Sequence, residues 1–210
     1  MMLFELFLTP VVTILAVALY SRERGNIIFP LSTFIIGAVF FFPGIFLFYL
    51  FRGIFPLAFS GTAMYLHYFY QDHLLHIVFS TIGLVLLRMF LQKTTHDNYV
   101  FRAVAYYGGY YSLVSCFYFL ENFSHLNPHV LFVLPLLHCS MVLLASIAFS
   151  QFHNRDGLER VLPLALLLVP AAVMGFVSSL PMHNNLVIAI ILAVIVAGAS
   201  GFAFVKLKDY

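Results

Sequence analysis

NNLVIAIILAVIVAGASGFAFVK, residues 184–206, is the stretch that decides the fold of this chain. It contains no charged residue before Lys206, and apolar side chains occupy every face of the helix that it would form. A helix needs about 20 consecutive apolar residues to cross the hydrocarbon core of a bilayer. A helix that is hydrophobic all round belongs in a membrane or deep inside a large protein. The stretch therefore predicts a transmembrane helix.

The composition of the whole chain agrees with this stretch. Hydrophobic residues make up 63% of the 210 residues, charged residues make up only 9%, and the mean hydropathy is +1.02. Such a chain cannot present a water-compatible surface around one buried core. The formal net charge of +2 and the scattered lysines and arginines exclude a phosphate-binding patch. We expect an integral membrane protein whose main partners are lipids, with no role in nucleic-acid binding.

Several further segments are long and apolar enough to cross a bilayer. We expect helices at residues 2–20, 27–51, 73–92, 99–120, 129–150, 160–180 and 184–206. These segments lack the polar and apolar alternation of a membrane barrel, and an open strand would leave its backbone unpaired in lipid. The predicted fold is all-α: a polytopic transmembrane helix bundle of six to seven spans that forms one membrane domain over residues 1–210.

Two segments leave alternatives open. Residues 53–70 are apolar, but Pro56 and Gly61 interrupt them, so we expect a segment at the outer membrane interface rather than another span. Residues 1–25 contain Glu5 and Pro10, and they either cross the membrane or lie on its cytoplasmic face.

The distribution of positive charge predicts the orientation. Nine of the ten lysines and arginines lie at one alternate set of helix ends: Arg22, Arg24, Arg88, Lys93, Arg102, Arg155, Arg160, Lys206 and Lys208. Only Arg52 lies at the opposite ends. Because cytoplasmic loops carry an excess of lysine and arginine, we expect a cytoplasmic C-terminus. The connections 52–72, 121–128 and 181–183 are then expected to face outward.

Histidines and acidic residues gather near the predicted outward connections. His73 and His76 are one helical turn apart, and Glu121 and His125 have the spacing of helical neighbours. Together they form a candidate three-ligand zinc site with an open position, as in a membrane hydrolase that faces outward. Amphipathic imidazoles are also common at membrane boundaries, and the chain contains no HExxH motif. We favour the boundary interpretation and expect no metal.

His138 is a separate case, because it lies about ten residues into its predicted helix and so near the middle of the membrane. We expect it to be the only ionisable side chain at that depth, with Tyr110 or Tyr111 of the preceding helix as its hydrogen-bond partner. An ionisable residue inside the membrane is a functional hypothesis by default. His138 either joins two helices or marks a polar point on a substrate path. Without an acidic partner at that depth, we expect passage of a neutral solute or lipid rather than ion-coupled transport.

Small residues recur at helical spacing on two predicted spans. The first set is Ala105, Gly109, Ser112 and Cys116, and the second is Ala189, Ala193, Ala197 and Gly201. Such stripes let helix backbones approach closely in lipid. We expect both to be packing faces, within the chain or against other subunits, including further copies of it.

Catalytic motifs are absent from the sequence. No GxSxG, GxGxxG or P-loop pattern occurs, and Cys116 and Cys139 stand alone without metal-binding spacing. We therefore expect no catalytic residue and no cofactor.

Several short motifs resemble one known family. They are LFLTP (6–10), SRERG (21–25), Pro30, GLVLLRMFLQKTTHDNYVFRAVAYYGGYYSLVSCFYFL (83–120), NPHVLFVLPLL (127–137) and NRDGLERVLPLALLLVPAAV (154–173). In this order they resemble the Yip family, the Ypt-interacting-protein domain. The resemblance implies about five membrane helices, a cytoplasmic N-terminus, no catalytic residues, and a role through protein partners. Its bacterial members imply a location in the inner membrane.

The chain departs from the Yip pattern in three ways. We expect it to lack the soluble N-terminal region, it has TTHDN at 94–98 where relatives tend to carry glycines, and we expect an additional span at 184–206.

Three functions follow from the sequence. The first is a non-enzymatic membrane protein that acts through helix association, as a scaffold or subunit of an assembly. The second is a small transporter or channel for a neutral solute or lipid, with a cavity near His138 and Tyr110. The third is the outward zinc-dependent hydrolase.

Overall fold

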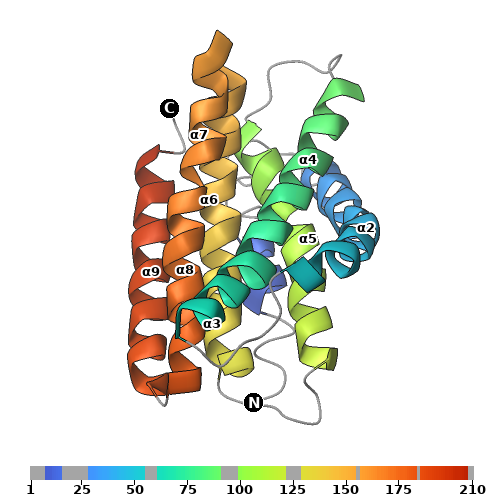
Figure 1. Ribbon diagram of the computed structural model, residues 1–210. Coiled ribbons are helices and arrows are strands. Elements are labelled where there is room, and N and C mark those ends of the chain that lie inside the picture. The colour runs from blue at the N-terminus through green and yellow to red at the C-terminus, as the bar shows by residue number, and fades with distance from the viewer. Residues whose placement is uncertain are drawn as a thin grey trace.

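Every element that the structure describes is helical. The computed structural model describes residues 8–15, 28–54, 61–90, 99–121, 129–154, 157–183 and 185–207. Most of the helices lie side by side along one long axis, whereas α4 (Leu75–Phe90) crosses the front of the bundle at an angle and α2 (Ile28–Phe51) is tilted away from that axis (Figure 1). The all-α prediction is confirmed for these ranges.

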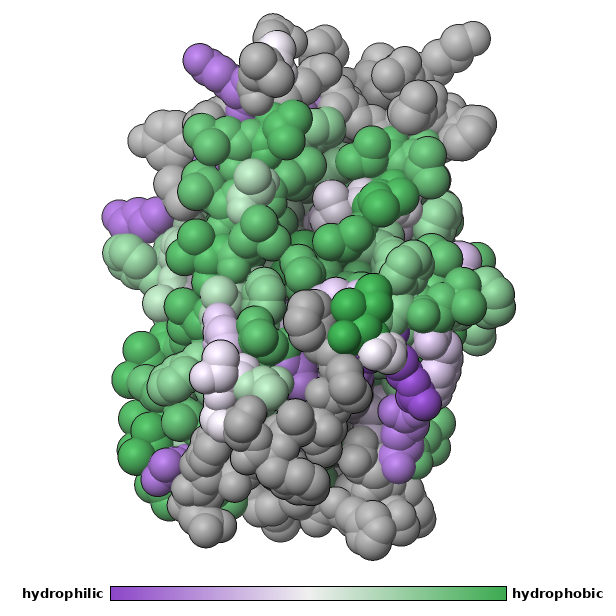
Figure 2. All heavy atoms as spheres, viewed as in Figure 1, coloured by the Kyte–Doolittle hydropathy of each residue, from purple (hydrophilic) through white to green (hydrophobic). Residues whose placement is uncertain are grey.

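Five of the described helices are long and apolar enough to cross a membrane. They are Leu31–Ile54, Gly61–Leu87, His129–His153, Val161–Ser179 and Leu186–Lys206. The face of the molecule in Figure 2 is largely hydrophobic across its middle, with hydrophilic residues toward the upper and lower parts. The described part of the chain is therefore an all-helical fold with five candidate membrane-spanning helices.

The outer helices expose their apolar side chains. α2 (Ile28–Phe51) and α9 (Leu186–Leu207) are the clearest cases, since Phe46 is 65% exposed and Phe202 is 67% exposed. In water this surface would be unfavourable by about 25 cal/mol for each Å² of apolar area. In a bilayer, lipid chains cover it at no such cost.

α5 (Tyr99–Glu121) is the central helix, and it packs against α2 on one side and α6 (Leu134–Asn154) on the other. The backbones of α5 and α2 lie very close together. A Cβ atom at Gly109 would overlap the carbonyl of Phe34, and one at Gly37 would overlap the carbonyl of Tyr106. The α5 stripe of small residues is thus a packing face within the chain.

The α9 stripe is divided between two environments. Ala189 and Ala193 are fully buried, and α9 packs against α6. Around Gly201, in contrast, no described atom lies within 4 Å of the position that a Cβ would take. The stripe is therefore open at Gly201.

The largest correction concerns residues 61–90. We expected residues 53–70 at the interface and a new helix at residue 73, but α3 (Gly61–Tyr68), the π-helical turn η2 (Phe69–Leu74) and α4 (Leu75–Phe90) are continuous. Gly61 starts this helix rather than interrupting it, and no proline or glycine follows until Gly83. The predicted outward connection 52–72 is wrong over residues 61–72, because the chain is helical there.

Prolines shape the second half of the bundle. The π-helical turn η4 (His129–Val133) precedes Pro135, whose ring has no N–H and clashes with the carbonyl four residues earlier, so a wider turn relieves the clash. After η5 (Gly157–Arg160), Pro170 interrupts the next helix at Leu167, which separates α7 (Val161–Leu166) from α8 (Leu168–Ser179). The short helix η6 (Leu180–His183) then leads to α9.

The described part of the N-terminal segment, residues 8–15, is helical, and one face of it packs against α5 while Ile14 and Leu15 are exposed. Thr9 and Thr13 are buried, and the Thr9 hydroxyl lies 3.4 Å from that of Ser115 on α5. This contact favours an inserted segment over one that lies flat on the membrane surface.

Candidate functional site

Polar and ionisable side chains from four parts of the chain meet in the interior of the bundle. We call this set the polar core; its members are Asp72, His73, His76, Tyr110, Tyr111, Ser115, Tyr118, His129, His138 and Ser178. They come from η2 and α4, α5, η4 and α6, and α8. All are buried except Tyr118, which is partly buried. A helix bundle with apolar outer faces therefore encloses a polar centre.

The two π-helical turns contribute to this core. Asp72 and His73 belong to η2, and His129 belongs to η4. A π turn adds a residue to the helical turn and changes which side chains face the interior, and such turns are frequent at functional sites. At η2 the chain also lies close to α8, since a Cβ at Gly175 would overlap the backbone of Phe69.

Three hydrogen bonds tie α4 and η2 to their neighbours. The Tyr118 hydroxyl donates to Oδ1 of Asp72 at 2.9 Å, and Nε2 of His73 lies 3.0 Å from the Ser178 hydroxyl. Nδ1 of His76 lies 3.3 Å from the hydroxyl of Tyr110. Each bond joins different helices, so the polar core also fixes how those helices pack.

His138 bonds to α5 through a different residue from the one expected. Its Nδ1 lies 3.0 Å from the Ser115 hydroxyl, and its ring lies beside those of Tyr111 and Tyr118, with centroid distances of 5.4 and 6.0 Å. Neither Tyr110 nor Tyr111 is the hydrogen-bond partner of His138. The hydroxyl of Tyr110 instead lies within hydrogen-bond distance of Nδ1 of His76.

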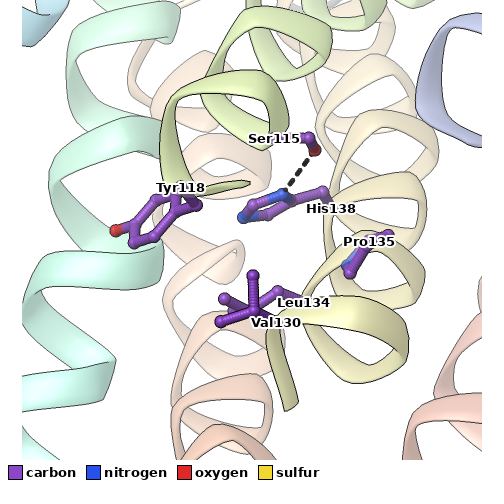
Figure 3. Close-up of a pocket in the computed structure, with 6 residues that line it drawn as sticks. All are labelled: Ser115, Tyr118, Val130, Leu134, Pro135 and His138. Carbon is purple, nitrogen blue, oxygen red and sulfur yellow. Dashed lines mark hydrogen bonds between the residues drawn. The ribbon is translucent and has the colours of Figure 1, made fainter. Parts of the chain in front are cut away.

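A crevice opens beside His138 between α5 and α6. Its lining residues are Ser115, Tyr118, Val130, Leu134, Pro135 and His138. In Figure 3 the imidazole points toward α5, and the hydroxyl of Tyr118 points away from it. The crevice is too narrow to hold a water molecule in this conformation.

Several atoms of the polar core have no hydrogen-bond partner within the described part of the chain. They are Oδ2 of Asp72, Nε2 of His76, both ring nitrogens of His129 and Nε2 of His138. A buried polar group without a partner costs roughly 1–3 kcal/mol. Hydrogen bonds within the described part of the protein therefore do not satisfy all the polar atoms of this core.

Two expectations about the ionisable residues in the interior of the bundle are wrong. His138 is not the only deeply buried ionisable residue, because Asp72, His73, His76 and His129 are buried as well. Asp72 in particular supplies the acidic group whose absence had argued against ion-coupled transport. The sequence analysis predicted that a helix begins at residue 73. Asp72 was therefore expected in a loop.

The proposed zinc ligands do not come together among the described residues. His73 and His76 lie in the polar core, whereas Glu121 lies at the end of α5, where it accepts a hydrogen bond of 2.7 Å from Tyr49 and pairs with Arg52 at 3.9 Å. His125 lies outside the described residues. No three histidine, cysteine or acidic side chains in the described ranges are placed to hold a metal ion.

Ser115 and Ser178 belong to the site, and Thr9 contacts it through Ser115, but none of the three was expected there. Serine and threonine in membrane helices usually bond their own backbone, as Ser146 does to the carbonyl of Val142. Nothing in the sequence distinguishes Ser115 from such residues. The spacing of Asp72, His76 and Ser80 every four residues was the one signal of a polar helix face.

Comparison with known proteins provides no relative. No protein-family model, no curated protein and no solved structure matches the chain.

Proposed function

We propose that this protein is a small membrane transporter whose polar core binds a solute with hydrogen-bonding groups. The observation that carries this proposal is the set of buried, unpartnered polar atoms contributed by η2, α4, η4 and α6. Ionisable residues in membrane helices are rare, and they mark substrate or ion pathways.

A purely structural role explains this arrangement less well. Interhelical hydrogen bonds in membranes contribute only about 0.6–2 kcal/mol each, and the unpartnered nitrogens of His129 and His138 offset that gain. An apolar core of the same volume would pack the same helices without this cost. A bound solute that supplies the missing partners accounts for the retention of both histidines.

Transport requires the crevice beside His138 to widen. Its walls are Ser115 and Tyr118 on α5 and Val130, Leu134 and Pro135 on η4 and α6. The wall on the α6 side begins with the π turn η4, a feature that is frequent at functional sites. We expect the movement to occur there, with α5 fixed by its close contact with α2.

The test is solute flux in proteoliposomes. Purified protein is reconstituted, and entry of radiolabelled glycerol, urea and glycine is compared with entry into protein-free vesicles. His138→Ala should reduce the flux of the transported solute about tenfold, as expected if about 1.4 kcal/mol of interaction is lost. Ser146→Ala, which removes a hydroxyl bonded within its own helix, is the matched control. Equal flux in His138→Ala and wild-type protein would contradict the proposal.

A second candidate is association with other membrane subunits or with another copy of the chain. One observation favours it: Gly198 and Gly201 on α9 have no described atom within 4 Å of a Cβ position. The resemblance to the Yip family points the same way, because that family acts through protein partners. With this second function, the protein would act as a scaffold or as a subunit of a membrane assembly.

Native mass spectrometry tests the second candidate. Gly198→Leu combined with Gly201→Leu should convert oligomers to monomers by blocking close helix approach. Gly53→Leu, an equally open glycine outside α9, is the control. A wild-type protein that is monomeric in mild detergent and retains no partner would exclude it.

A further inference from the structure

Asp72 differs from the other acidic residues that the structure describes. It is 5% exposed, whereas Glu121 is 38% exposed and Glu159 is also exposed. It lies well inside the candidate span Gly61–Leu87. A carboxyl group at that position is rare, and in membrane proteins it marks a proton relay or an ion path.

The two oxygens of Asp72 have unequal surroundings. Oδ1 accepts the hydrogen bond from Tyr118, while Oδ2 is buried with no partner in the described ranges. No lysine or arginine in those ranges forms an ion pair with Asp72; the pair found there joins Arg52 and Glu121. Because an uncompensated buried carboxylate is very unfavourable, the side chain carries a proton when the core is closed.

Titratable groups lie near Asp72 on three elements. They are Tyr68 of α3, His73 and His76 of its own helix, and Tyr118 of α5; His129 of η4 lies farther along, with its ring 5.8 Å from that of Tyr68. α8, which packs on η2, contributes no titratable side chain. The ring of Tyr118 lies 5.9 Å from that of His76 and 6.0 Å from that of His138, each of which has an unpartnered Nε2. Within the described ranges, Asp72 thus bonds to Tyr118, whose ring lies beside two histidines, and pairs with no lysine or arginine.

We propose that Asp72 is the proton-binding residue of this protein and that solute transport is coupled to proton movement through it. This inference rests on the transporter function proposed above. The step is a proton transfer alone: the bond between Oδ2 and hydrogen forms when the site loads from water on one side and breaks when it empties to the other. Tyr118 holds Oδ1 throughout, so that Oδ2 is the oxygen that exchanges.

Infrared difference spectroscopy tests the proton site without a solute. Full-length protein in lipid should show the C=O stretching band of a protonated carboxylic acid, with a shift in D₂O. Asp72→Asn should lose this band, and Glu121→Gln should keep it. Tyr118→Phe should move it to higher frequency, because the carbonyl loses its hydrogen bond; a merely structural role for Tyr118 would not move it. A band unchanged in Asp72→Asn would overturn the inference.

Solute accumulation tests the coupling. In proteoliposomes with an imposed pH gradient, wild-type protein should accumulate whichever of glycerol, urea and glycine it transports. Asp72→Asn should lose this accumulation, whereas Glu121→Gln, which changes an exposed carboxylate outside the polar core, should keep it. Accumulation equal to wild type would overturn the coupling. Absence of flux in wild-type protein would contradict the transporter function instead, and the infrared band would still decide the role of Asp72.

Discussion

At the scale of single residues, Ser115 connects three segments of the chain through one hydroxyl. It lies 3.0 Å from Nδ1 of His138 on α6 and 3.4 Å from the hydroxyl of Thr9 in the N-terminal segment. A hydroxyl has one donor and two acceptor sites, so both contacts are possible together. Loss of this group would leave a second nitrogen of His138 without a partner.

We predict that Ser115→Ala lowers the unfolding free energy by about 1 kcal/mol, the size of an interhelical hydrogen bond in a membrane. Ser146→Ala should change it by less, because the Ser146 hydroxyl bonds only within its own helix. Both are measured by reversible unfolding in mixed micelles. Equal stability of the two variants would show that the contact between Ser115 and His138 contributes nothing to folding.

The sequence identified part of the site at this scale. His138 was recognised from its depth in a helix with a clear start, and it is fully buried. His73 and His76 were recognised as a pair but assigned to a membrane boundary. Their burial depends on the continuity of the helix that begins at Gly61 and on the packing of η2 against α8, which the sequence pattern does not show.

At the scale of elements, the contact between α2 and α5 depends on glycine. The carbonyl of Phe34 occupies the place that a side chain at Gly109 would need, and the carbonyl of Tyr106 does the same at Gly37. Such close approach increases dispersion contact between two helices that gain no hydrophobic energy from association in lipid.

We predict that Gly109→Ala destabilises the protein by about 1–3 kcal/mol, the usual cost of overpacking a tight interface. Gly201→Ala should be neutral or slightly stabilising, because the position is open and alanine has the higher helix propensity. Thermal unfolding of both variants in the same detergent provides the comparison. A smaller loss for Gly109→Ala than for Gly201→Ala would contradict the close contact.

Helix ends were predictable where proline or a charge fixed them. The start near Pro128 and the ends of the last span agree with α6 and α9 within a few residues. The π turns were not predictable, because a change from α to π hydrogen bonding leaves the apolar pattern of a sequence almost unchanged. Pro135 gives a physical reason for η4, but no proline accompanies η2.

At the scale of the whole molecule, the topology depends on whether α5 crosses the membrane. It has 23 residues, so at 1.5 Å per residue it is about 34 Å long. Its tyrosines and Arg102 keep it out of the five strongly apolar helices, yet most of its side chains are buried. Lipid does not need to solvate a helix that α2 and α6 cover, so low hydropathy does not prevent α5 from crossing.

We predict that positions 52 and 206 lie on opposite sides of the membrane. Between them lie α3 with α4, α5, α6, α7 with α8, and α9, which give an odd number of crossings if α5 spans and an even number if it does not. The excess of lysine and arginine further places Lys206 on the cytoplasmic side.

Arg52→Cys and Lys206→Cys are made in a background with Cys116 and Cys139 replaced by alanine, and a membrane-impermeant maleimide is added to intact cells. Position 52 should react and position 206 should react only after lysis; reaction of both in intact cells would mean that α5 does not cross.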